Sequence, residues 1–288
     1  MTKSRIRIVT DTSARFPTPR LWKHPLVTAA EFSIRQGNRQ EVEDPLQPLE
    51  AYRSVFQPED GPTLAAPPGP STFAQIYRHL HKETDQIVSI HTAAAASQIT
   101  HNALAASEEF LGRCRIQVID SGSMSFGLGL LVQAAVHAAD AGQSFDDVVR
   151  VVRGMIPRLY MIFFVDDLQH LERHGLIAHS QAVLGNMLGV IAFLTMEDGR
   201  LIPMEKVRTR TRALEKLVEF VAEFSDLEHI AVLHGMKQAD EDKRWLDERL
   251  ESLHPGVPVA HADYGPTMAT LVGTNSLGVF VLEQENGA

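Results

Sequence analysis

Short apolar runs alternate with longer helical patterns along the first half of the chain. The runs at residues 6–9, 87–91 and 116–119 are rich in β-branched side chains and predict buried strands. Apolar or alanine-rich segments of helical length follow at 103–111 and 127–141, and the pattern predicts another helix at 148–156. This βαβα order is typical of a parallel sheet covered by helices.

The pattern changes near residue 155. The run at 159–165 predicts a buried strand, residues 167–174 a short helix that ends before Gly175, and residues 175–196 a short helix followed by a strand from about 189. That strand turns at Asp198 and Gly199 into a hairpin. Further elements follow: helices at about 209–224 and 239–253, and strands at 229–233 and 277–282. We therefore predict two domains, 1–155 and 156–288, with the Pro- and acid-rich segment 40–72 as an irregular excursion of the first.

Composition narrows the possible partners and compartments. The 27 Lys and Arg against 36 Asp and Glu leave a net charge of −9, which argues against a nucleic-acid partner. A lone cysteine, Cys114, excludes an intramolecular disulfide and favours a reducing compartment. The chain enters its first strand without the apolar core of a secretion signal, and polar residues and three glycines interrupt its longest uncharged stretch, 175–196. We expect a cytoplasmic protein with at most transient membrane contact.

Two polar turns come directly after predicted strands. Asp11, Thr12 and Ser13 follow the first strand, and Asp120 to Ser123 follow the third. Oxygen side chains at the carboxyl edge of a parallel sheet suit ligand binding. The same residue types also cap helices, so both roles stay open.

These turns belong to an ordered set of motifs that resembles the DegV family, bacterial fatty-acid-binding proteins that present acyl chains to a separate kinase subunit. Further motifs are residues 168–171 ahead of Gly175, residues 198–200 with 206–209, residues 264–266 and residues 277–279. The resemblance covers nearly the whole chain. It implies a two-domain α/β fold, with an N-terminal parallel open sheet flanked by helices, a C-terminal α/β domain and one acyl chain in a tunnel between them.

The chain departs from the family where the family binds the fatty-acid carboxylate. The resemblance places Ala65 at the family's threonine, Ala93 at its serine and Leu271 at its histidine. The surviving polar residues, expected at the tunnel mouth, are Ser13, Ser121, Ser123 and Arg208. Either the head group is held by neighbouring polar residues, or the ligand is neutral at that end. The candidates to replace the lost groups are Thr63, Thr92, Ser97, Thr267, Thr270 and Arg208.

Approximate free energies of burial favour a carrier that still binds the acyl tail of its ligand. Burying a sixteen-carbon tail contributes roughly 10 kcal/mol gross, whereas a buried carboxylate without partners costs several kcal/mol. The hypothesis is therefore a non-catalytic protein that binds a long-chain fatty acid or other acyl lipid and presents it to a fatty acid kinase subunit, without a cofactor. The alternatives are an unrecognised enzyme, or a scaffold or sensor whose tunnel is filled by its own side chains: Met124, Met155, Met161, Met187 and Leu271.

Other chemistry has little support in the sequence. His170 and His174 have the i, i+4 spacing of metal ligands, with His179 nearby, but no Glu follows the first histidine as in zinc proteases. A solvated helix face is therefore favoured over a metal site. The glycines at 122, 127 and 129 match neither a phosphate-binding P-loop nor a dinucleotide fingerprint, and the chain has no G-x-S-x-G elbow.

Overall fold

The structure, a computed structural model, describes residues 6–57, 60–165, 167–173, 175, 177–236 and 240–285. Its N-terminal sheet has the strand order β2-β1-β6-β7, and each neighbouring pair is parallel. The strands are β1 (Arg7–Asp11), β2 (Val27–Ala30), β6 (Gln86–His91) and β7 (Arg115–Asp120). The β-branched runs form strands here because helices cover both faces of the sheet and exclude water from either side.

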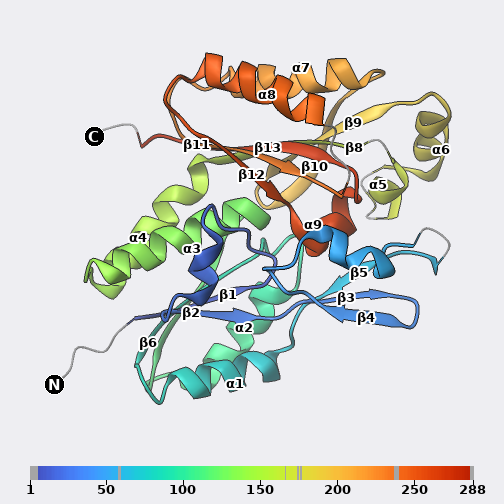
Figure 1. Cartoon of the computed structure of the whole chain (residues 1–288). Helices are drawn as coiled ribbons and strands as arrows, with labels where there is room; N and C mark the ends of the chain where they lie inside the picture. The colour runs from blue at the N-terminus through green and yellow to red at the C-terminus, as the bar shows by residue number, and fades with distance from the viewer. Residues whose placement is uncertain are drawn as a thin grey trace.

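Two pairs of helices cover this sheet. Helices α1 (Pro70–Leu80) and α2 (Ile99–Ser107) pack on one face, and α3 (Ser125–Asp140) and α4 (Phe145–Met155) on the other (Figure 1). Ser144 caps α4 by accepting a hydrogen bond from the Asp147 amide. Short 3-10 turns complete this half of the chain: η1 (Pro19–Lys23), η4 (Glu108–Phe110) and η5 (Ile156–Arg158).

The segment 40–72 is more regular than the sequence predicts. Strands β3 (Ser33–Gln36), β4 (Arg39–Val42) and β5 (Leu64–Ala66) form a small antiparallel sheet, with the 3-10 helix η2 (Leu49–Val55) between β4 and β5. The expectation of an irregular excursion is therefore wrong for these elements. Strands of three or four residues are too short to show a clear alternation in sequence.

The C-terminal sheet has the strand order β10-β9-β8-β13-β11-β12 and is antiparallel except for the pair β11 and β12. Its strands are β8 (Leu159–Val165), β9 (Ile191–Glu197), β10 (Arg200–Val207), β11 (Leu227–His234), β12 (Val259–Asp263) and β13 (Leu277–Glu283). Its helices are α5 (Gln169–Arg173), α6 (His179–Met187), α7 (Arg210–Val221), α8 (Asp240–Leu253) and α9 (Gly265–Val272). Strands β2 and β12 and helices α1 and α9 are absent from the sequence-based expectation. Among the described residues, no helix has the length and apolar character needed to cross a bilayer.

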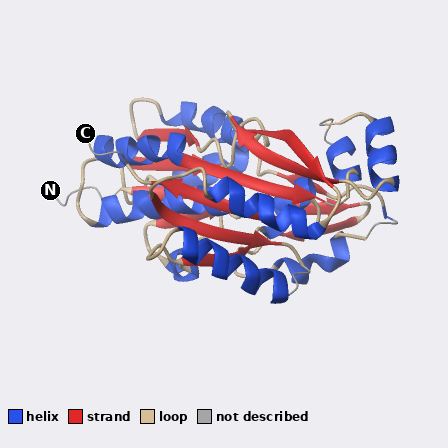
Figure 2. Ribbon diagram, turned by 90° about the horizontal axis from the view of Figure 1, so that it is seen from above, coloured by secondary structure: helices blue, strands red, loops and turns tan. Residues whose placement is uncertain are grey.

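The two sheets stack in layers with helices between them and outside them. Helices α7 and α8 cover the outer face of the C-terminal sheet, while α3, α4 and α9 lie between the sheets. Seen from above, helices overlie the strands along much of the molecule (Figure 2). The two-domain α/β architecture therefore agrees with the fold class predicted from the sequence.

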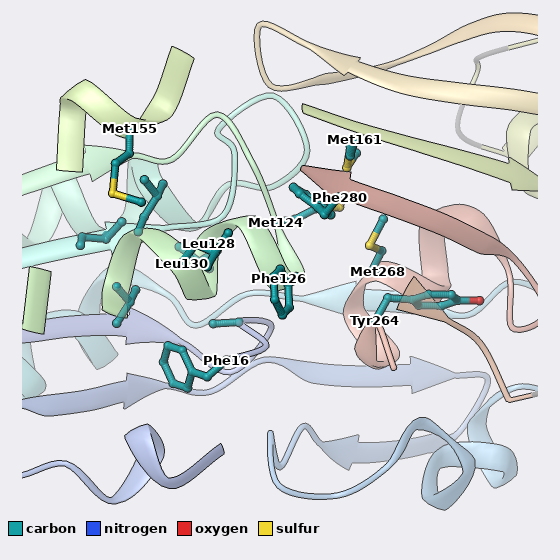
Figure 3. Close-up of a cluster of buried hydrophobic side chains, with 14 of the residues drawn as sticks. Phe16, Met124, Phe126, Leu128, Leu130, Met155, Met161, Tyr264, Met268 and Phe280 are labelled. Carbon is teal, nitrogen blue, oxygen red and sulfur yellow. The ribbon is translucent and has the colours of Figure 1, made fainter. Parts of the chain in front are cut away.

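The largest apolar cluster lies between the sheets rather than within one domain. It joins side chains of the first sheet, such as Ile8, to Phe126 of α3 and to Met161 and Phe280 of the second sheet. Figure 3 shows Met124, Phe126, Met161, Met268 and Phe280 side by side in this layer. The interface between the domains is thus an apolar layer rich in methionine, whose flexible side chains fill irregular space.

Candidate functional site

A cavity of about 300 Å³ lies between the turn that follows β6 and helix α9. It stands at the carboxyl end of a parallel strand, the position where open α/β folds bind ligands. It is lined by Phe32, Leu64, Ala65, Pro67, Thr92, Ala94, Ala95, Ala96, Ser97, Gln98, Met124, Thr267, Thr270 and Leu271. The walls are apolar with a few hydroxyls and one amide, and the volume is at the lower end of the range for small-molecule sites.

Behind Thr92, a buried carboxylate organises the polar wall. Asp11, at the end of β1, accepts hydrogen bonds from the amide and hydroxyl of Ser13, the amide and hydroxyl of Thr92, and Nδ1 of His91. All four residues are at most 2% exposed. Five donors on two oxygens suit an ionised carboxylate, which only accepts. The residues that follow β1 and β6 are therefore fixed against each other.

A chain of hydrogen bonds continues from Asp11 into the first domain. Nε2 of His91 lies 2.7 Å from Oγ of Ser89, which lies 2.8 Å from the hydroxyl of Tyr77. Burial raises the pKa of Tyr77 above its usual value, so Tyr77 stays protonated. At the other end of this chain, Nδ1 of His91 donates to the carboxylate of Asp11, which can only accept. Every member has a partner, as a buried polar group requires.

This arrangement determines what Thr92 can offer a ligand. Its Oγ1 lies 3.1 Å from Oδ1 of Asp11 and 2.7 Å from Oγ of Ser13, whose own proton goes to Asp11. Because the Thr92 proton points toward these buried oxygens, the hydroxyl presents lone pairs to the cavity. Thr92 can accept a hydrogen bond there, but it is a poor donor to an anion.

The second polar turn supports the wall from behind. Oδ1 of Asp120 accepts from the amides of Ala94 and Gly122, at 3.1 and 3.0 Å. Ser121 donates to the carbonyl of Ser123, which accepts from the amide of Ala93. The hydroxyl of Ser121 is therefore used inside the turn, and the turn as a whole holds residues 93–96 in place.

A buried ion pair stands behind Thr267 on the opposite wall. The hydroxyl of Thr267 donates to Oε2 of Glu43, and Nη2 of Arg15 donates to Oε1 of Glu43 at 3.0 Å. Arg15 also donates to the carbonyls of Thr12 and Ala14 and lies 3.6 Å from Asp263. Burial raises the pKa of Glu43 to about 7, even though Arg15 and Thr267 act in the opposite direction.

The sequence-predicted site residues divide between the cavity and its surroundings. Ala65, Thr92, Ser97 and Leu271 line the cavity, and Ser13 contacts Thr92 from behind. Buried Ala93 faces the second domain instead, because a Cβ at Gly199 would lie 3.2 Å from Cβ of Ala93. The alignment with the family's head-group serine therefore does not bring Ala93 to the cavity wall.

Three predicted residues lie apart from this wall. Arg208 is exposed and follows the last residue of β10, whereas the Asp198–Gly199 turn precedes the first. Because Gly199 lies against Ala93, the length of β10 separates Arg208 from Ala93. Thr63 donates to the carbonyl of Val55 and lines a second, smaller cavity of about 180 Å³. Ser123 is buried within its turn.

The methionines differ in their environment. Met124 lines the cavity and also belongs to the interdomain cluster, which includes buried Met155 and Met161. Met187 is 80% exposed, so it fills no interior space. Leu271 lies on the cavity wall. Met124 therefore connects the cavity wall to the interdomain cluster.

The histidines give no sign of a metal centre in the described part of the chain. His174 lies outside the described residues, and His170 packs close to Gly273. His179 pairs with Glu172 at the surface, with Nδ1 2.6 Å from the carboxylate. Within the described ranges, no three His, Cys, Asp or Glu side chains group as metal ligands would.

Sequence reasoning missed Arg15, Glu43 and His91 as parts of the site. His91 could have been predicted, because it ends a strand and directly precedes Thr92, which was a candidate site residue. No local pattern marks Glu43, which follows a short strand in a segment expected to be irregular. Its partners are Arg15, in the turn after β1, and Thr267 on α9, which is 224 residues away along the chain.

Comparison with known proteins agrees with this architecture. The model of the DegV family, described as uncharacterised proteins, matches residues 5–284. A DegV domain-containing protein of Streptomyces coelicolor is 30% identical over 278 residues, covering 96% of this chain and 98% of its own.

Two solved structures have the same fold. A fatty-acid-binding DegV family protein from Streptococcus agalactiae superposes with a TM-score of 0.86 at 23% identity, covering 98% of this chain and 100% of its own. The fatty acid kinase B3 protein of Streptococcus pneumoniae, loaded with linoleic acid, superposes with a TM-score of 0.81 at 15% identity, covering 97% and 99%. On the match along nearly its whole length and its identity to the Streptomyces protein, this chain belongs to the DegV family.

Proposed function

We propose that this protein binds one acyl lipid, with the head group in the cavity beside Thr92 and α9 and the tail in the methionine-rich layer between the domains. The observation that carries the proposal is Met124, which lines the cavity and packs in that layer. An apolar tail entering there replaces contacts among movable side chains and contributes about 0.8 kcal/mol per buried methylene. The Streptococcus agalactiae neighbour binds fatty acids, which supports the same ligand class here.

The head-group end of the cavity favours a ligand other than a bare carboxylate near and above neutral pH. Ala65 and Leu271 offer no hydrogen bonds, and Thr92 offers lone pairs. The hydroxyls of Thr267 and Thr270 donate to Glu43 and to the carbonyl of Thr267. The remaining side-chain donors of the lining are the hydroxyl of Ser97, whose proton has no acceptor among the described residues, and the amide of Gln98. Two neutral donors on the more exposed side suit an ester, amide or hydroxyl better than an ion.

We infer a non-catalytic role in which the protein carries its lipid to a partner enzyme. The Streptococcus pneumoniae neighbour is a fatty acid kinase protein, so a kinase subunit is the partner class that this fold suggests. We place the domain boundary at residues 155–156, where α4 ends ahead of β8. A cytoplasmic location agrees with the single, buried Cys114, whose pKa burial raises to about 11 and which is therefore a poor thiolate.

Mass spectrometry of the ligand tests the proposal directly. Protein purified without detergent is unfolded in organic solvent, and the extract is compared with that of Met124→Trp, which adds bulk at the residue shared by the cavity wall and the core. We expect an acyl lipid from the natural protein and much less from the variant. Extracts with no lipid, together with no binding of dodecanoate or methyl dodecanoate by calorimetry, would contradict the carrier role.

A further inference from the structure

Thr267 and Glu43 form a hydrogen-bonded pair at the cavity wall that has two possible proton arrangements. Thr267 lies in the first turn of α9 and lines the cavity, while Glu43 behind it is 1% exposed. The amide of Glu43 donates to the carbonyl of Phe32, which fixes the residue against the small sheet. The carboxyl group therefore has one face toward Arg15 and one toward Thr267.

The charges around Glu43 come from several elements. Arg15 donates to one oxygen, and Asp263 at the end of β12 shares the same guanidinium. Asp11 on β1 adds negative charge at longer range. The amide of Asp44, which follows Glu43 in the chain, donates to the hydroxyl of Tyr52 on η2. Burial raises the pKa of Glu43 to about 7 although Arg15 faces it, and Asp11 adds to this rise, so this site can take up a proton near neutral pH.

The proton on Glu43 decides which atom Thr267 presents to the cavity. An ionised Glu43 only accepts, so the Thr267 proton points at it and the cavity meets lone pairs. Arg15 occupies Oε1, so a proton on Glu43 resides on Oε2 and is donated to Oγ1 of Thr267. The Thr267 proton then turns toward the cavity.

We propose that Thr267 is the head-group donor for an anionic acyl ligand, and that binding the anion takes one proton from solvent onto Glu43. A neutral acyl ester needs no such donor and binds without proton uptake. The proton and the anionic charge enter together, so the buried site gains no net charge. This inference rests on the acyl-lipid binding proposed above.

Calorimetry in buffers of different ionisation enthalpy tests the proposal, with dodecanoate and methyl dodecanoate as ligands from pH 6 to pH 8. For the natural protein and dodecanoate, we expect proton uptake to rise from near zero to about one per ligand, and Kd to rise up to about tenfold between pH 7 and pH 8. The ester should show neither effect. Equal uptake with both ligands, or none with dodecanoate, overturns the proposal.

Three variants assign the proton to Glu43. Glu43→Gln keeps an acceptor for Arg15 and a donor for Thr267, so dodecanoate should bind it without proton uptake and with a Kd independent of pH. Thr267→Val should weaken dodecanoate binding about tenfold or more at pH 6, on the scale of one charge-assisted hydrogen bond, and leave the ester unchanged. Glu41→Gln, the same charge change on the outer strand β4, should behave like the natural protein.

The outcomes distinguish the two proposals. Uptake that persists in Glu43→Gln means that the ligand itself carries the proton, which overturns the role of Glu43. Binding of dodecanoate with unchanged affinity by Thr267→Val overturns the role of Thr267. Failure of both ligands to bind the natural protein rejects the acyl-lipid site and this inference together.

Discussion

Ser13 and Thr92, which are 79 positions apart in the chain, bring their hydroxyl oxygens to 2.7 Å from each other beside the carboxylate of Asp11. Parallel pairing of β1 with β6 places both residues at one edge of the sheet. The cavity wall is therefore held by a polar cluster within the first domain, whose hydroxyl protons are used internally.

Replacing Asp11 by Asn tests that cluster. The amide nitrogen would face donors from Ser13, Thr92 or His91, so a buried acceptor becomes a donor. We expect a loss of about 3 to 5 kcal/mol in the free energy of unfolding, measured by urea denaturation. Asp120→Asn, an exposed carboxylate with two amide partners, is the control and should lose about 1 kcal/mol. Equal losses would contradict a special role for Asp11.

Gly265, the first residue of α9, lies directly against the side chain of Arg15. Its φ is +78°, and an added Cβ would lie 2.1 Å from Nη2 of Arg15. Gly265→Ala should therefore destabilise the protein by more than about 2 kcal/mol through both strain and the displaced guanidinium. Gly256→Ala, with φ of +93° and open space around it, shows the backbone cost alone. Thermal unfolding of both variants at pH 8 separates backbone strain from displacement of Arg15. A similar loss of stability in both variants would show that displacing Arg15 adds no cost.

Shortening Met124 tests the path of the tail. Met124→Ala should lower the unliganded free energy of unfolding by about 2 to 4 kcal/mol, because a cavity replaces a buried side chain. An acyl ester fills that space, so the rise in Tm on adding saturating ester should exceed that of the natural protein. Met155→Ala, in the same apolar cluster but outside the cavity lining, should lose stability without this larger rise. A matching rise in the Met155 variant would place the tail elsewhere.

Restoring the family's residues at the cavity wall tests the head-group preference. The double change Ala65→Thr and Leu271→His adds two donors at the lining, and should strengthen dodecanoate binding by about 2 to 4 kcal/mol at pH 8, relative to the ester. Ala93→Ser serves as the control, because that side chain faces Gly199, and should not change the preference. Calorimetric titration with both ligands gives the comparison. If the natural protein already prefers the free acid at pH 8, another group holds the carboxylate.

The raised pKa of Glu43 makes stability depend on pH. Folding favours the protonated form, because the pKa rises from 4.5 to about 7 in the folded protein. This stabilisation is complete below about pH 4.5 and is lost as the pH rises through about 7, by up to about 3 kcal/mol. The difference in unfolding free energy between the natural protein and Glu43→Gln should fall by that amount from pH 5 to pH 8. A difference that stays constant in urea titrations would show that Glu43 remains ionised throughout.

Elements with long or strongly apolar patterns, and the family, could be predicted from the sequence. Strands β1, β6, β7, β8 and β13 and helices α3 and α7 match their predicted positions within a few residues, because burial on both faces or along one stripe leaves a local pattern. The sequence also indicated the two polar turns and the edge of the sheet where they meet. It could not place Ala93 or Arg208 relative to the cavity.

Which side chains meet at the cavity depends on the packing of the folded chain. Glu43 and Thr267 are 224 positions apart, and Asp11 and Thr92 are 81 apart, yet each pair is hydrogen-bonded. The periodicity of a helix or strand relates residues only a few positions apart, so it carries no information on such pairs. Their contact depends on strand order and on how α9 packs over the first domain. The proton arrangement at the cavity wall follows from that packing.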